Sequence, residues 1–252
     1  MRSLVRRSVV ATVVLVSAAA PLTACGGGGG DKTITVLAAS SLTGTFTDLA
    51  AQFEKDHPGV KVKLAFDSSA TLAQQAAGGA PSDVLATADT TTMDSARSAL
   101  SSTPQDFATN VMTLVTPSDN PSGITRFSDL DSGHVKYVVC VDTAPCGKVA
   151  AALLTQDHIT ARPVSTEVDV KSVLAKVTEG EADAGIVYRT DAVSAGDAVK
   201  TVPIPGTERQ TTTYPIATLD QSEQPDLARA FVDLVLSGTG RQVLGHAGFG
   251  AT

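Results

Sequence analysis

The sequence predicts an α/β protein, because short apolar segments alternate with amphipathic segments along most of its length. Residues 34–38 are apolar apart from Thr35 and fit a buried strand. Residues 42–53 carry apolar side chains at helical spacing until a His-Pro-Gly turn at 57–59 ends the pattern. Residues 60–66 alternate as in a half-buried strand, and residues 71–77 fit a second helix. This repetition is typical of the α/β class.

The same alternation continues toward the C-terminus. Further strands are expected at 84–88, 111–115, 135–141, 184–187, 199–202 and 216–219, and further helices at 93–100, 148–157, 170–179 and 226–236. About 220 residues follow the glycine-rich segment near the N-terminus, enough for one large or two small domains.

The N-terminus has the pattern of a secretory signal. Three arginines precede an apolar run, residues 9–20, which at about 12 residues is well short of the roughly 20 that a membrane-spanning helix needs. The sequence Leu-Thr-Ala-Cys that ends at Cys25 resembles the lipobox of bacterial lipoproteins, with an ordinary cleavage site as the alternative. We expect residues 1–24 to be a signal peptide. Residues 25–32 would be a lipidated Cys25 and a glycine tether that hold the exported protein at the outer face of the cytoplasmic membrane.

Charge limits the classes of partner. The formal net charge is −7, and removal of residues 1–24 with their three arginines lowers it to −10. An acidic protein is a poor match for nucleic acid or for a basic membrane-binding patch. It also repels anions at long range, so an anion site would have to act locally, which screening over roughly 8 to 10 Å permits.

The two remaining cysteines, Cys140 and Cys146, are expected to form a disulfide, because an oxidised pair is the usual state in exported proteins. Metal binding is the alternative. It is the weaker one, since two thiols without a neighbouring histidine fall short of the four ligands of a structural zinc site.

No catalytic template was found. The sequence lacks a G-x-S-x-G elbow, an H-E-x-x-H pair and a phosphate-binding loop. Asp67, Asp83 and Asp89 stand at expected turns, where a carboxylate usually caps a helix or fixes the turn. Acid–base chemistry and metal binding by these residues are the alternatives. We expect a protein that is not an enzyme.

Two serine pairs each stand between an expected strand and an expected helix: Ser40 with Ser41, and Ser68 with Ser69. A helix start presents unpaired N–H groups and the positive end of the helix dipole, and a serine adds a hydroxyl donor. Helix capping alone is the simpler interpretation of either pair. Two pairs at successive strand-to-helix turns favour a shared anion site, because adjacent parallel strands end at one crevice.

The strings VLAASSLTGTF, FDSSATLAQQ, GAPSDVLATAD and ADAGIVYRTDAV resemble the periplasmic molybdate-binding proteins that supply ABC importers. The resemblance extends from about residue 33 to the C-terminal RQVLGHAGFG. It implies a two-lobed, periplasmic-binding-protein-like fold of type II, with the ligand cleft between the lobes. Lobe 1 would comprise residues 33–112 and 217–252, and lobe 2 residues 113–216.

The resemblance also implies a ligand set. Motif matches give hydroxyl donors at Ser41 and Ser69, backbone N–H donors at Cys146 and Val170, and a phenolic donor at Tyr188. Ser40 and Ser68 would support the site. Cys146 stands where the family often has another small residue, and Asp67 is unusual before the serines.

A site built from donors favours an oxyanion that carries no proton, such as molybdate, tungstate or sulfate, whereas phosphate would need an acceptor such as Asp67 or Asp83. We expect molybdate, with tungstate bound almost as well, no cofactor and no protein-ligated metal. The expected protein is a monomer that delivers its ligand to the permease subunits of an importer. The alternatives are a sulfate or phosphate receptor and, from other classes, an exported hydrolase or a surface-interaction protein.

Overall fold

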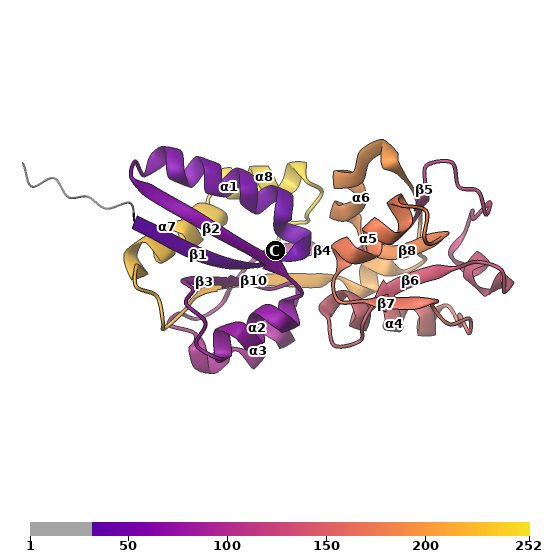
Figure 1. Ribbon diagram of the computed structural model, residues 1–252, viewed down its shortest axis with the longest axis horizontal. Helices are drawn as coiled ribbons and strands as arrows, with labels where there is room; N and C mark the ends of the chain where they lie inside the picture. The colour runs from indigo at the N-terminus through magenta and orange to yellow at the C-terminus, as the bar shows by residue number, and fades with distance from the viewer. Residues whose placement is uncertain (1–31) are drawn as a thin grey trace, which may run out of the picture.

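The computed structural model describes residues 32–252, and the expected signal peptide, the lipidation site at Cys25 and the glycine tether lie outside the described residues. The described chain forms two five-stranded sheets with helices on their faces (Figure 1). We call the part of the chain around the first sheet the first lobe and the part around the second sheet the second lobe.

The first lobe contains elements from both ends of the described chain. Its strands are β1 (Lys32–Ala39), β2 (Val60–Asp67), β3 (Val84–Ala86), β4 (Gln105–Asn110) and β10 (Thr212–Thr218), and its helices are α1 (Thr43–Asp56), α2 (Ser69–Ala77), α3 (Thr90–Ser95), α7 (Pro225–Leu236) and α8 (Gly238–His246). The strand order is β2-β1-β3-β10-β4, with β1 parallel to β2 and β3, and β10 antiparallel to β3 and β4.

The second lobe repeats this pattern with the middle of the chain. Its strands are β5 (Met112–Pro117), β6 (Tyr137–Cys140), β7 (Ser165–Glu167), β8 (Ala184–Tyr188) and β9 (Val199–Val202), and its helices are α4 (Pro145–Gln156), α5 (Val170–Thr178) and α6 (Arg189–Ala195). The order β7-β6-β8-β5-β9 repeats the first arrangement, because β6 is parallel to β7 and β8, and only β5 runs antiparallel to its neighbours β8 and β9. In both lobes the parallel strands end toward the other lobe, which confirms the predicted α/β, two-lobed fold (Figure 1).

Apolar helix faces cover both sides of the first sheet. On one side Phe53 of α1 and Phe231 of α7 meet edge to face, with ring centroids 5.5 Å apart, and Phe46 lies 5.9 Å from Phe231. This geometry adds to the stabilisation from burying the rings. On the other side α2 and α3 pack Leu72 and Met93 against the sheet. The helices therefore hold the ends of β1, β2 and β3 in fixed positions.

The chain passes between the sheets at two places, Val111 between β4 and β5, and Thr211 before β10. The expected lobe boundaries were after 112 and after 216. The second of these falls inside β10, but β10 pairs with β3 and β4 over its whole length, so the strand belongs to the first sheet. The exact domain limits remain a proposal, and the strand pairing favours limits at Val111 and Thr211.

Several local predictions differ from the structure. Helix α4 begins at Pro145 rather than 148, because a proline is favoured in the first turn of a helix, where its missing N–H costs nothing. The expected helix at 93–100 is the short α3 followed by a 3₁₀ turn, Arg97–Ala99. The strands β4 and β7 and the helices α6 and α8 were not predicted. Their sequences are short, polar or glycine-containing, and only packing against the rest of the chain selects their conformations.

Candidate anion-binding site

A small cavity lies between the lobes, where the parallel strands of both sheets end. It encloses about 10 Å³, roughly the space of one water molecule by this measure. All the predicted ligand and supporting residues line it: Ser40, Ser41, Ser68, Ser69, Cys146, Val170 and Tyr188. The fold thus brings these residues, which are far apart in sequence, around one cavity.

The first-lobe wall consists of hydroxyl groups at the starts of helices. Ser41 lies in a 3₁₀ turn, Ser40–Leu42, between β1 and α1, and Ser69 is the first residue of α2. Both serines are buried, and Ser69 Oγ accepts a hydrogen bond of 3.0 Å from the Ala88 N–H. The side chain of Ser68 stands at the N-cap of α2 but makes no capping hydrogen bond. The serine side chains are therefore not used up by helix capping, which was the simpler interpretation.

The second-lobe wall consists of helix starts and one phenol. Cys146 is the second residue of α4, Val170 is the first residue of α5, and Tyr188 ends β8 just before α6. The first N–H groups of an α-helix have no partner within the helix, and the helix dipole favours negative charge there. Two residues at helix starts and one tyrosine thus line the cavity from this lobe.

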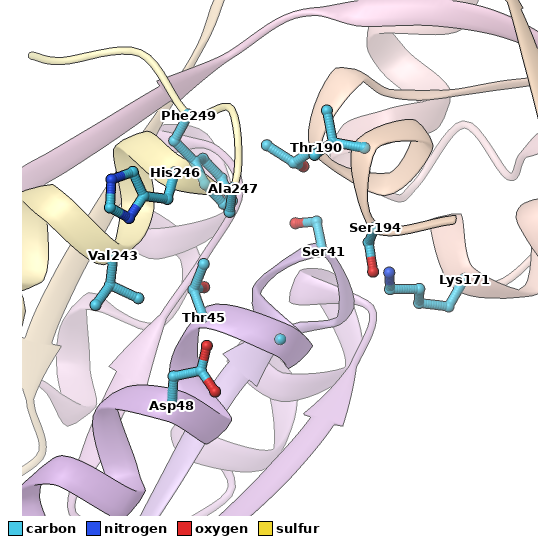
Figure 2. Close-up of a pocket in the computed structure, with 12 residues that line it drawn as sticks. Ser41, Thr45, Asp48, Lys171, Thr190, Ser194, Val243, His246, Ala247 and Phe249 are labelled. Atoms are coloured by element: carbon cyan, nitrogen blue, oxygen red, sulfur yellow. The ribbon is translucent and has the colours of Figure 1, made fainter. Parts of the chain in front are cut away.

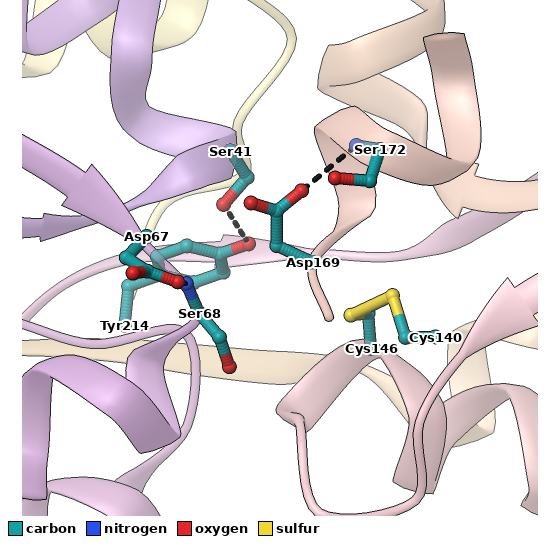
Figure 3. Close-up of a disulfide and its surroundings, with 8 residues drawn as sticks. All are labelled: Ser41, Asp67, Ser68, Cys140, Cys146, Asp169, Ser172 and Tyr214. Atoms are coloured by element: carbon teal, nitrogen blue, oxygen red, sulfur yellow. Dashed lines mark hydrogen bonds between the residues drawn. A yellow bond between two sulfur atoms is a disulfide. The ribbon is translucent and has the colours of Figure 1, made fainter. Parts of the chain in front are cut away.

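Cys140 and Cys146 form the predicted disulfide, with Cα atoms 5.7 Å apart, and metal binding by this pair is thereby excluded (Figure 3). Among residues 32–252 no cluster of three or more histidine, cysteine, aspartate or glutamate side chains can hold a metal ion. The disulfide ties the end of β6 to the first turn of α4. A Cβ at Gly147 would come within 1.9 Å of the Val141 carbonyl oxygen, so the helix start lies directly against the strand end.

Tyr188 carries an unpaired hydroxyl. The side chain is 1% exposed, and its Oη makes no hydrogen bond with any described residue. Burial raises the pKa of this phenol well above its ordinary value, so it stays protonated at physiological pH. Because a buried hydroxyl without a partner is costly, it is suited to an acceptor that enters the cavity.

The sequence reasoning missed Asp169, whose carboxylate lines the cavity. Asp169 is the N-cap of α5, and its Oδ1 accepts a hydrogen bond of 2.8 Å from the Ser172 N–H (Figure 3). An aspartate just before an expected helix start is a recognisable capping signal.

The three acids that the sequence places at turns, Asp67, Asp83 and Asp89, have local roles. Asp67 accepts from the Ser68 N–H, Asp83 from the Thr35 N–H, and Asp89 caps α3 through the Thr92 N–H.

A larger pocket of about 280 Å³ adjoins the cavity at Ser41, which lines both (Figure 2). It lies between α1 and α8 of the first lobe and α5 and α6 of the second. Lys171 lines it, with Nζ 3.0 Å from Oδ1 of the fully buried Asp191. Burial raises the pKa of Asp191, and the Lys171 ammonium opposes that rise. This ion pair links the start of α5 to the start of α6, and so fixes Val170 relative to Tyr188.

Residues 34–250 match the family described as bacterial extracellular solute-binding protein. The chain belongs to this family. Solute-binding proteins of this kind bind ligands rather than catalyse reactions, which agrees with the absence of catalytic motifs in the sequence. Within the described range, no helix is long and apolar enough to cross a membrane.

Named relatives of this solute-binding protein include the molybdate-binding protein ModA of Mycobacterium tuberculosis, which is 42% identical over 220 residues, covering 86% of this chain and 84% of the relative. The molybdate-binding protein ModA of Escherichia coli K12 is 31% identical over 229 residues, covering 86% and 88%. A solved substrate-binding domain of a putative molybdenum ABC transporter from Clostridium difficile has a TM-score of 0.65 at 29% identity, covering 87% of this chain and 99% of that one.

Proposed function

We propose that this protein binds molybdate, and tungstate nearly as well, outside the cytoplasm and delivers it to the permease subunits of an ABC importer. The observation that carries the proposal is that Ser41, Ser69, Cys146, Val170 and Tyr188 all line one small cavity. We infer that the three hydroxyls and the N–H groups of Cys146 and Val170 are the donors to the ion. The names of the relatives agree with this ligand.

Five donors are a suitable set for a dianion. Each hydrogen bond to a charged group contributes roughly 1.5 to 3 kcal/mol net of the hydrogen bonds lost to water, so five of them favour binding of the ion. No lysine, arginine or histidine occurs among the described residues that line the cavity. The charge of the ion would therefore be balanced by backbone dipoles and hydroxyl groups rather than by a cationic side chain.

Donors on both lobes also explain how binding would drive closure. Ser41 and Ser69 belong to the first lobe, and Cys146, Val170 and Tyr188 to the second. The ion can contact the donors of both lobes only when the lobes are closed. It therefore binds the closed form more tightly and shifts the population toward that form. Between the lobes Lys148 Nζ also lies 3.4 Å from Asp89 Oδ2.

Anchoring by a lipid on Cys25 and the monomeric state belong to the same proposal. Their support is in the sequence: the lipobox-like segment before Cys25 and the glycine tether that follows it. A tethered binding protein stays near the importer while its lobes move freely.

A phosphate receptor is the second candidate, because Asp169 supplies an acceptor at the cavity that a protonated anion needs. The replacement Asp169→Asn separates the two candidates, since asparagine also caps helices well. Removal of this carboxylate should strengthen molybdate binding about threefold by relieving charge repulsion, and should weaken phosphate binding.

The experiment is a thermal-shift panel with molybdate, tungstate, sulfate and phosphate. A ligand at 100 times its dissociation constant stabilises the folded state by roughly 2.7 kcal/mol, which raises the melting temperature by several degrees. We expect shifts with molybdate and tungstate and a much smaller one with sulfate, whose smaller size leaves donors out of reach. A shift with phosphate and none with molybdate would contradict the proposal.

A further inference from the structure

A buried chain of hydrogen bonds runs from the cavity to the connection between the lobes. Ser41 Oγ lies 3.0 Å from Tyr214 Oη, and Asn110 Nδ2 lies 3.4 Å from the same phenolic oxygen and 2.9 Å from Thr190 Oγ1. All four side chains are buried. Tyr214 and Asn110 belong to β10 and β4, the strands next to the two crossings, and Thr190 belongs to α6 of the second lobe. Figure 3 shows the contact between Ser41 and Tyr214.

The direction of these hydrogen bonds follows from the amide of Asn110. Its Oδ1 accepts a hydrogen bond of 3.0 Å from the Val111 N–H, and an N–H can only donate. The other amide atom is therefore the nitrogen, which can only donate as well. Tyr214 Oη thus accepts from Asn110 and keeps its own hydrogen for another partner.

Tyr214 Oη makes two hydrogen bonds with the described residues, to Asn110 Nδ2 and to Ser41 Oγ, and of these two partners only Ser41 Oγ can accept a hydrogen. Tyr188 lies beside Tyr214, with ring centroids 5.9 Å apart, but its hydroxyl makes no hydrogen bond with any described residue. The remaining partner of Tyr214 is Ser41 Oγ. Burial raises the pKa of Tyr214, so the phenol keeps its proton.

We propose that Tyr214 is a positioning residue that sets the polarity of Ser41: it donates to Ser41 Oγ, so that the single hydroxyl hydrogen of the serine is left for the bound anion. A serine that instead donated to Tyr214 would present only lone pairs to the ligand. Ser69 is arranged in the same way, since its oxygen accepts the Ala88 N–H and its hydrogen stays free. This inference rests on the proposed function and deepens it, because hydroxyls fixed as donors select anions that carry no proton.

The test is calorimetric titration of the full chain with molybdate, tungstate, sulfate and phosphate, using Tyr214→Phe, Ser41→Ala and the double variant. Tyr214→Phe should weaken molybdate binding roughly five- to tenfold. This loss is smaller than that expected from removing one whole hydrogen bond to a charged ligand, because the Ser41 hydroxyl is still present. Phosphate should lose less, because a protonated oxygen can donate to the freed lone pair of Ser41. In the Ser41→Ala background Tyr214→Phe should have no further effect.

Tyr137→Phe is the matched control, because it removes another buried phenol, whose hydroxyl donates to the Ala161 carbonyl within the second lobe. It should leave every anion affinity within about twofold of the parent protein, since Tyr137 makes no contact with the cavity. Asn110→Asp is a second variant that exchanges the donor for an acceptor in nearly the same shape. Asn110→Asp should draw the Tyr214 hydrogen away from Ser41 and weaken molybdate binding at least as much as Tyr214→Phe. The part of this loss that acts through the Ser41 hydroxyl should be absent in the Ser41→Ala background.

Two results would overturn the inference. One is a Tyr214→Phe variant that binds molybdate as tightly as the parent protein. The other is an equal loss with and without the Ser41 hydroxyl, because Tyr214 would then act through packing alone. If the parent protein itself binds none of the four anions, the proposed function fails, and the polarity assignment fails with it.

Discussion

The two walls of the cavity offer hydrogen-bond donors of different kinds to the proposed anion. In the proposed site the first lobe supplies side-chain hydroxyls from Ser41 and Ser69, whereas the second supplies backbone N–H groups at Cys146 and Val170 together with the phenol of Tyr188. A hydroxyl disappears when its residue is replaced, but a backbone N–H survives almost any replacement. The first wall therefore depends on the identity of its residues, and the second mainly on the path of its chain.

The largest expected effect comes from removing the first-lobe hydroxyls. Ser41→Ala combined with Ser69→Ala should weaken molybdate binding roughly 100-fold or more, because two hydrogen bonds to a charged ligand are lost. Calorimetric titration measures this. The matched control is Ser40→Ala with Ser68→Ala, which removes two neighbouring hydroxyls and should cost less than about threefold. Equal losses in the two double variants would break the distinction between ligand and supporting serines.

Tyr188→Phe tests the one side chain on which the second wall depends. Binding should weaken roughly tenfold, while the free energy of unfolding of the unliganded protein should rise by about 1 kcal/mol, because a buried hydroxyl without a partner is removed. Tyr137→Phe should lower the free energy of unfolding, because it removes a hydroxyl that donates a hydrogen bond of 2.6 Å to the Ala161 carbonyl. Urea unfolding and titration together measure both quantities. A Tyr188→Phe variant with lower stability would mean that the hydroxyl is already satisfied in the free protein.

The smallest expected change in affinity comes from the disulfide. Cys140→Ser combined with Cys146→Ser should lower the free energy of unfolding by about 2 kcal/mol, the chain-entropy value for so short a loop. It should change molybdate affinity less than about threefold, because the Cys146 N–H remains at the start of α4. The measurements are urea unfolding and titration. A loss of affinity as large as that of the Ser41 and Ser69 double variant would show that the second wall also depends on its side chains.

Much of the fold and of the candidate site could be predicted from the sequence. The segments around Ser41 and Ser69 have clear local signals, namely an apolar strand, a turn and a helix start. Tyr214 has no such signal, because its partner Ser41 is 173 positions away and the contact exists only after β10 has joined the first sheet. Helix α8 was missed for another reason: its glycines lower helix propensity, and packing against α1 and α7 outweighs that cost.

The pairing of Asn110 with Thr212 places the two crossings next to each other. The two adjacent connections form a hinge. The lobes can rotate about the axis that joins the two connections, and the pair of connections resists rotation about other axes. Points on the hinge axis move least during the rotation. Since Asn110 lies there and Tyr214 follows Thr212 on β10, the donor direction of Ser41 would be set while the lobes are still apart. An arriving ion would then meet a first wall that needs no rearrangement.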